Sequence, residues 1–435
     1  MTSTRAAQPL GGFGTAGRSP LADSRELAAV SGALYPVLTL LVRLPQTMVP
    51  LGVLTTVALI SGSPALGTLC AAAVTLGSAL CGLAMGAAAS WRRRQLGLVL
   101  LTLVNPPAVW WLVRMLPDLS ADADAEPAQL VLPCLLAGLV LPQMGVACRL
   151  RWWSLLGRDA REDLFDTALR HESVMDSLAT VLAAAVTGLV AVTLGPVSVL
   201  VLAATLTLVG TTVFLLHSSA RAPAGPVHVL PRVPPAPSRA GRRRRRRTRQ
   251  LRLLPVVGMA ALGSFVGATL GAVVVFTTAV DTVVSVSWLY AVSGLTSALA
   301  AVAASTRTEA MRLWNRWVAA AAGAVLAAML LTIPDDSVGM VVVLALAGLT
   351  TGPCLVAVYE IARLVAPSSR VTALTTLMTA AMSLGLTVGL ALSGWSGETW
   401  GYRTAALVPV VSAAVLLATA LGFVHRWRRT VPADL

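Results

Sequence analysis

Long apolar stretches recur along this chain, each about as long as an α-helix must be to cross a lipid bilayer. A helix needs about 20 residues to span roughly 30 Å of hydrocarbon. Hydrophobic residues make up 56% of the chain and charged residues only 12%, against roughly a quarter charged in an average soluble domain. The sequence therefore predicts an all-α membrane protein and excludes a string of soluble domains. Twelve spans are expected, at 37–60, 65–89, 96–116, 130–148, 173–194, 197–217, 255–280, 284–304, 314–333, 339–359, 371–395 and 405–424.

The arginines give this topology a direction. All 33 basic residues are arginine, and with both chain ends placed in the cytoplasm 30 of them fall on the inner side. Only Arg114 and Arg403 fall outside, while Arg43 lies in or at the edge of the first span. Such an excess marks cytoplasmic loops. We therefore expect a multi-pass protein of the cytoplasmic (inner) membrane, with twelve spans and both termini cytoplasmic.

The longest polar stretch divides the spans into two groups of six. Residues 1–34 lack an apolar signal segment and are expected to form a disordered cytoplasmic tail. Residues 35–217 and 255–424 form the two predicted six-helix bundles, and residues 425–435 a second tail. The Pro/Arg-rich linker 218–254 is expected to be disordered. Its run Arg242–Arg247 is interpreted as a topology signal that contacts anionic lipid headgroups, not as a nucleic-acid site.

Several kinds of chemistry lack the residues they need. The five cysteines and four histidines are scattered, without the spacing of a metal site. A chain without lysine has no Walker A motif, so direct use of ATP is not expected. No nucleophile and base pair is evident in the sequence. We therefore expect neither a cofactor, a metal nor an enzymatic activity, and a membrane-embedded enzyme is the least favoured alternative.

Charged residues near the first, fourth and fifth spans are the candidates for coupling or gating. Glu172 and Asp176 are four residues apart, so they lie on one face of a helix. Because two neighbouring carboxylates repel, they require a cation or a shared proton. Arg149 and Arg43 are expected at the same depth, and protons are a possible coupling partner. Alternatively, the two acids merely cap the start of a helix, where the helix dipole favours negative charge.

Polar residues inside other spans are candidates for lining a substrate cavity. Gln46 in the first span and Gln143 in the fourth could bind a ligand or instead join neighbouring helices. Thr379 and Ser383 begin a polar stripe, spaced by four residues, that continues to Thr387 in the eleventh span. Such hydroxyls can also bond to carbonyls of their own helix.

Particular stretches resemble bacterial members of the major facilitator superfamily. These stretches are Arg43–Leu51, Pro142–Gly145 followed by Arg149–Trp152, Glu172–Asp176, and Ser383–Gly389 with Gly401–Arg403. The resemblance implies two six-helix bundles that rock around a central binding site for a small molecule. It implies a secondary transporter, with proton-linked export of a partly apolar organic molecule as the first interpretation and uptake as the alternative.

The chain also departs from this family's pattern. Ala87 stands where the loop after the second span usually carries its first arginine, and Ser90 stands at the position of an acidic latch residue. Residues Ala183–Ala185 replace the Gly-Pro pair typical of drug/proton antiporters. These departures favour a second hypothesis, a transporter-like membrane scaffold that does not transport.

Overall fold

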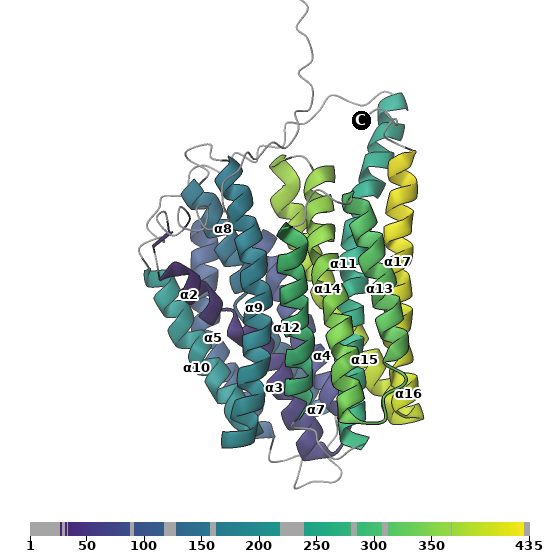
Figure 1. The fold of residues 1–435 in the computed structure, drawn as a ribbon. Helices are drawn as coiled ribbons and strands as arrows, with labels where there is room; N and C mark the ends of the chain where they lie inside the picture. Colours follow the sequence, from purple (N-terminus) through teal and green to yellow (C-terminus); the bar gives the residue numbers. More distant parts are fainter. Residues whose placement is uncertain are drawn as a thin grey trace, which may run out of the picture.

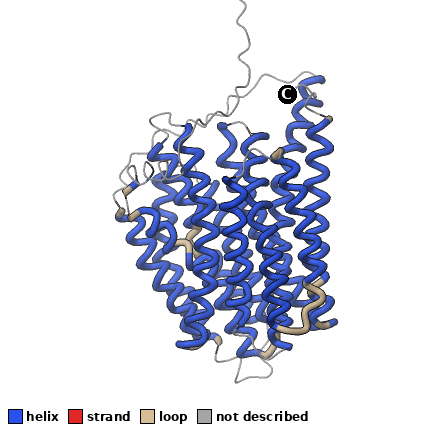
Figure 2. Tube along the Cα trace, viewed as in Figure 1, coloured by secondary structure: helices blue, strands red, loops and turns tan. Residues whose placement is uncertain are grey.

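A computed structural model describes most of the chain. The described residues are 27, 31–32, 34–87, 91–116, 128–156, 162–217, 239–279, 285–306, 312–366 and 368–429. Their ordered elements are helices that run roughly side by side (Figures 1 and 2). The helices before the central linker are α2 Tyr35–Leu41, α3 Leu44–Ser61, α4 Pro64–Ala87, α5 Trp91–Met115, α7 Ala128–Leu139, α8 Met144–Leu156, α9 Glu162–Leu194 and α10 Pro196–Leu216. Those after it are α11 Arg239–Ala279, α12 Ser285–Thr306, α13 Leu313–Leu330, α14 Ser337–Val365, α15 Ser368–Trp400, α16 Tyr402–Ala405 and α17 Leu407–Arg428.

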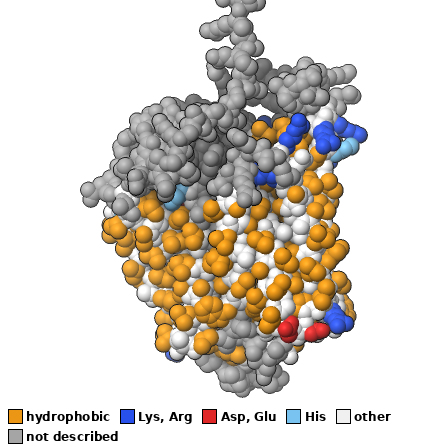
Figure 3. Space-filling view, viewed as in Figure 1, with side chains coloured by type: hydrophobic (Ala, Val, Ile, Leu, Met, Phe, Trp, Pro, Cys, Tyr) orange, Lys and Arg blue, Asp and Glu red, His pale blue; other side chains and the backbone are white. Residues whose placement is uncertain are grey.

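The lengths and apolarity of these helices confirm an all-α, multi-pass membrane protein. Among the described residues, 11 helical segments are long and apolar enough to cross a bilayer, and α9 adds the shorter apolar segment Leu178–Leu194. We call α2–α10 the N-half and α11–α17 the C-half; they lie next to each other in Figure 1. Hydrophobic side chains cover the flanks in Figure 3, where lipid tails are the expected solvent.

Charge distinguishes the two ends of the bundle. We call the end where α5 begins and α17 finishes the basic end, because Arg93 and Arg94 lie at the start of α5 and Arg426 and Arg428 at the end of α17. Figure 3 shows basic side chains at this end of the molecule. At the other end, which we call the opposite end, Asp335, Asp336 and Glu398 accompany Arg403. The helices thus separate charge as the sequence predicts.

Three segments differ from the sequence-based expectations. The fourth span is not one continuous helix but is broken between α7 and α8. Pro142 lies in the break, and its lack of an N–H group explains the interruption. The linker 218–254 is helical from Arg239, where α11 begins; its prolines precede that residue, and arginine favours helices. In the predicted disordered tail, Leu27 and Ser31 are helical and buried, and Leu27 packs near Tyr35. Apart from Gly32 and Leu34, the other residues of 1–34 lie outside the described residues, as do 218–238.

Within each half, glycines bring helix backbones into direct contact. A Cβ atom at Gly385 of α15 would overlap the carbonyl oxygen of Ala260 in α11, and one at Gly263 would overlap that of Met382. In the N-half, Gly77 of α4 and Gly138 of α7 approach the facing backbone in the same way. Small residues permit this close packing in membranes, where water does not drive helices together.

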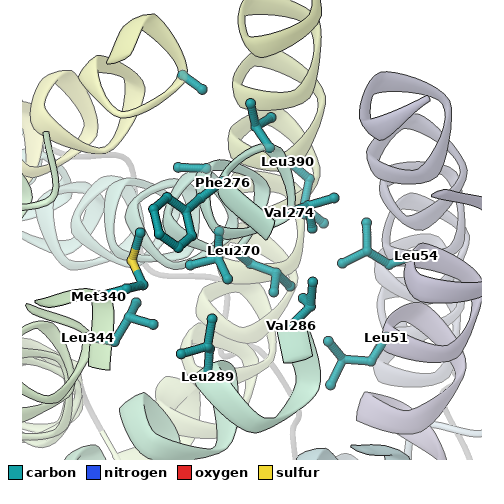
Figure 4. Close-up of a cluster of buried hydrophobic side chains, with 14 of the residues drawn as sticks. Leu51, Leu54, Leu270, Val274, Phe276, Val286, Leu289, Met340, Leu344 and Leu390 are labelled. Atoms are coloured by element: carbon teal, nitrogen blue, oxygen red, sulfur yellow. The ribbon is translucent and has the colours of Figure 1, made fainter. Parts of the chain in front are cut away.

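Between the halves, side chains make the contacts. Leu51 and Leu54 of α3 point toward Leu270 and Val274 of α11 and Val286 of α12 (Figure 4). Gly188 of α9 lies beside the indole of Trp288 in α12, so α9 and α12 form a second line of contact. Along these two lines of contact the halves meet through side chains, whereas the glycines named above bring backbones together inside each half.

The glycine packing leads to a first prediction. Gly385→Val should lower the thermal unfolding temperature of the purified protein, because the new side chain overlaps the α11 backbone; overpacking costs about 1–3 kcal/mol. Gly422→Val is the matched control, since the nearest atom to its Cβ is Leu254 Cδ2, 4.0 Å away. Equal unfolding temperatures for the two variants would contradict the close contact.

Candidate functional site

The break between α7 and α8 places a polar side chain inside the membrane region. Gln143 is the last residue before α8 and is 8% exposed. Its amide nitrogen donates to Ser78 Oγ at 2.7 Å. Gln46 Nε2 donates to the Pro142 carbonyl at 3.2 Å and to Gln143 Oε1 at 3.4 Å. Gln46 therefore supports the broken segment, while Gln143 faces α4.

A narrow cavity lies next to Gln143, between the two halves. Side chains fill most of it, so that it has room for little more than a water molecule. The structure thus brings three of the four predicted cavity residues, Gln143, Thr379 and Ser383, to one space, whereas Gln46 lies behind Gln143. The lining residues are Ser78, Ala79 and Gly82 of α4, Gln143 and Val146 at the start of α8, and Thr376, Thr379, Ala380 and Ser383 of α15.

The hydroxyls along α15 form hydrogen bonds both within their own helix and to neighbouring helices. Thr379, Ser383 and Thr387 each donate to the carbonyl four residues earlier, at 3.0, 3.3 and 3.0 Å. Their oxygens can still accept hydrogen bonds. The Thr379 oxygen lies 3.2 Å from the Tyr359 hydroxyl of α14, within the C-half. The Thr387 oxygen lies 2.8 Å from that of Thr75 on α4, in the N-half.

Beyond this cavity, α4 and α15 close against each other toward the opposite end. After the Thr75–Thr387 contact, a Cβ atom at Gly394 would overlap the Thr68 hydroxyl. At the end of the helices, a Glu398 carboxylate oxygen accepts from Ser63 Oγ at 2.8 Å and from the Ala65 amide at 3.1 Å. A carboxylate is favoured at the start of α4, where backbone N–H groups are unpaired. The cavity therefore lies on the basic-end side of a closed interface.

The four predicted charged residues meet in one network. Arg43 lies in the break between α2 and α3, and its guanidinium forms an ion pair with Glu172 of α9. Arg43 Nε lies 2.8 Å from Asp176 Oδ1, and Arg149 Nη1 lies 3.3 Å from Asp176 Oδ2. Arg43 and Glu172 are 2% and 0% exposed, whereas Asp176 is 33% exposed. Two acids and two arginines thus compensate one another.

The network adjoins the cavity between the halves. Gly145, the second residue of α8, leaves room for Arg149 and Asp176, whose side chains lie 3.2 and 3.4 Å from where its Cβ would stand. Val146, one turn before Arg149 on α8, lines the cavity together with Thr379 and Ser383 of the C-half. The Arg149–Asp176 pair consequently lies one helical turn from the cavity.

The helix-cap interpretation of Glu172 and Asp176 is wrong. The helix α9 begins at Glu162, well before either residue, because the polar stretch ahead of the apolar span is also helical. Glu172 points into the protein, where its second oxygen accepts from Trp152 Nε1 at 2.7 Å. Helix α9 therefore extends past the apolar span, and Glu172 and Asp176 both belong to the charged network.

Trp152 and Tyr35 are the supporting residues that the sequence reasoning missed. Trp152 is 1% exposed, and Tyr35 packs edge-on against it with ring centroids 5.2 Å apart. Thr39 contributes a backbone carbonyl that accepts from Arg43 Nη1 at 3.2 Å. A buried indole usually finds an acceptor for its N–H, but the sequence contains 11 tryptophans and does not indicate which one faces Glu172.

Comparison with known proteins identifies the fold. No protein-family model matches this chain, and no curated protein matches it. Among solved structures, the nucleoside transporter NupG is 13% identical with a TM-score of 0.61, covering 90% of this chain and 98% of that one. An autoinhibited peptide transporter of the POT family is 14% identical with a TM-score of 0.61, covering 92% of this chain and 98% of that one. The human organic anion transporter MFSD10 is 14% identical with a TM-score of 0.61, covering 92% of this chain and 99% of that one. The chain therefore has the fold of major facilitator transporters, as the sequence predicts.

The charged network leads to a second prediction. Glu172→Gln should destabilise the protein by about 3–5 kcal/mol, because removing one partner of a buried ion pair leaves two arginines to share the single carboxylate of Asp176. The double variant Arg43→Gln/Glu172→Gln should recover most of this loss, since Asp176 keeps Arg149 as its partner. Thermal unfolding of Glu172→Gln, Arg43→Gln and the double variant measures the coupling, with exposed Asp335→Asn as control. Additive effects of the two substitutions would contradict the pairing.

Proposed function

We propose that this chain is a secondary transporter that moves a small organic molecule across the cytoplasmic membrane by alternating access. The observation that carries the proposal is the cavity between the halves, followed at once by the Thr75–Thr387 contact that shuts it toward the opposite end. The arginine distribution supports a cytoplasmic orientation of the basic end. In this orientation the Thr75–Thr387 contact closes the cavity toward the outside.

The cavity lining favours a small molecule that is partly apolar and forms hydrogen bonds. Gln143, Ser78 and the hydroxyls of α15 offer donors and acceptors, while Ala79, Val146 and Ala380 offer apolar surface. The transporters of like fold are named for nucleosides, peptides and organic anions, each a molecule that combines such groups. Apolar walls with a few fixed polar groups are typical of small-molecule sites.

We further propose that protons drive export and that Asp176 carries the proton. Asp176 is partly exposed beside the cavity and bridges Arg43 and Arg149. Protonation of its carboxylate would remove the negative charge that pairs with Arg149. The proton could thus change the charge between the halves at the point where they separate. Glu172 instead stays paired inside the N-half.

The alternative is a membrane scaffold of the same fold that stays in one state. Ala87 and Ala183–Ala185 favour it, because these positions lack the arginine and the Gly-Pro pair expected from the resemblance; Ser90 lies outside the described residues. A transporter must expose its cavity to both sides of the membrane, whereas a static scaffold need not. This difference can be measured before any substrate is known.

The third prediction tests alternating access. In a variant without native cysteines, Ser383→Cys should react with an impermeant thiol reagent applied to intact cells and also to inverted vesicles. Cross-linking a Thr75→Cys/Thr387→Cys pair in the same chain should abolish labelling from outside, because the bond holds α4 and α15 together. Exposed Asp335→Cys is the control that reports the reagent's access. Labelling of Ser383→Cys only in inverted vesicles would support the scaffold.

The fourth prediction tests proton coupling in proteoliposomes. A panel of nucleosides, short peptides and organic anions is screened by counterflow, and a compound that exchanges is then followed under a pH gradient. Asp176→Asn should retain exchange but lose gradient-driven accumulation by at least about tenfold, because the side chain no longer binds a proton. A paired Arg149→Gln change should partly restore stability, since it removes the unpaired arginine. Asp335→Asn should accumulate substrate normally.

Normal accumulation by Asp176→Asn would locate coupling elsewhere or exclude it. Absence of exchange for every compound, together with two-sided labelling of Ser383→Cys, would retain alternating access and reject these substrate classes.

A further inference from the structure

Glu398, near the end of α15, reaches across to the first turn of α4 in the other half. One oxygen of its carboxylate accepts two hydrogen bonds, from Ser63 Oγ at 2.8 Å and from the Ala65 N–H at 3.1 Å. Ser63 is the residue before α4, which begins at Pro64. An acidic side chain of the C-half therefore caps a helix of the N-half at the opposite end.

The first turn of α4 uses Glu398 as one of its hydrogen-bond acceptors. N–H groups in the first turn of a helix have no partner within that helix. Pro64 has no N–H, and the Leu66 N–H donates to Ser63 Oγ at 3.1 Å. The Ala65 N–H, between them, donates to Glu398. The Ser63 hydroxyl thus accepts a hydrogen bond from its own helix and donates one to Glu398, so the cap joins the two halves.

The Glu398 contact is the outermost of three that α4 and α15 make on the way to the cavity between the halves. The two helices run antiparallel, so each step inward along α4 is matched by a step back along α15. From the opposite end toward the cavity, the contacts are Ser63–Glu398, Thr68–Gly394 and Thr75–Thr387. Access to the cavity from this end therefore requires all three contacts to part.

The chemistry of the outermost contact suits one that breaks and forms again. Hydrogen bonds to a carboxylate are stronger than those between neutral groups, and the helix dipole favours negative charge at the start of α4. Glu398 is exposed, so water can hydrate its carboxylate once the helices separate. Glu172 differs, because it is 0% exposed and parting from Arg43 would leave a charge without water or partner.

We propose that Glu398 is a latch, a gating residue that holds the cavity closed toward the opposite end and releases it when the carboxylate leaves the start of α4. This inference rests on the alternating access proposed above and names the residue that sets its balance. Only the closed state contains the contact, so weakening it shifts the population toward the state open at this end. Loss of a helix cap typically changes an equilibrium by about fivefold.

The test measures access to the cavity from each side of the membrane in the full-length protein. In a variant without native cysteines, Ser383→Cys is labelled by an impermeant thiol reagent in intact cells and in inverted vesicles. Glu398→Ala removes the latch. Thr399→Ala is the matched control, because this neighbouring residue is exposed and its hydroxyl donates to a carbonyl of its own helix at 2.9 Å. Gly394→Ala is the positive control, since its Cβ would overlap Thr68 and push α4 and α15 apart.

We expect Glu398→Ala to raise the labelling rate in intact cells about fivefold, in line with the loss of a cap, without raising it in inverted vesicles. Thr399→Ala should leave both rates unchanged. Glu398→Gln should fall between the wild type and Glu398→Ala, because its amide oxygen still accepts a hydrogen bond but carries no charge.

Faster labelling from both sides in Glu398→Ala would indicate general loosening of the protein and would overturn the latch. Unchanged labelling in Glu398→Ala together with faster labelling of Gly394→Ala in intact cells would also overturn it, while alternating access would stand. Absence of labelling in intact cells for every variant would reject both the latch and alternating access.

Discussion

Inside a bilayer, each polar group that leaves a helix must find its partner within the protein. The two helix breaks of the N-half follow from this constraint. At the first, Arg43 lies between α2 and α3 and is compensated by Glu172 and Asp176 of α9. At the second, the carbonyl of Pro142 accepts from Gln46. The breaks are therefore tied to other helices by polar contacts.

These partners determine where the candidate site can form. Glu172 binds Arg43 through one carboxylate oxygen and Trp152 through the other, so both oxygens of this buried side chain have partners. Asp176, one turn further along α9, is shared by Arg43 and Arg149 and remains partly exposed. Burial thus divides two acids of similar chemistry into a structural role for Glu172 and a proposed role in coupling for Asp176.

The contrast between the two kinds of helix contact bears on motion. Backbones touch at Gly263 and Gly385 inside the C-half, and at Gly77 and Gly138 inside the N-half. Between the halves, the contacts come from hydroxyls such as Thr75 and Thr387 and from apolar side chains such as Leu51. Side-chain contacts can part without exposing backbone groups, which suits halves that move as units.

The sequence alone determined the approximate positions of the spans and the residue types available at the site, because length and apolarity suffice to predict a membrane helix. It also indicated that Glu172, Asp176, Arg149 and Arg43 belong together, since adjacent carboxylates require cations. It could not place the break at Pro142, extend α9 back to Glu162, or separate Gln46 from the cavity that Gln143 lines. Those features depend on which side chain of a distant helix lies opposite. Only the tertiary structure decides this, because the same polar residue binds a neighbouring helix or faces a cavity according to what packs against it.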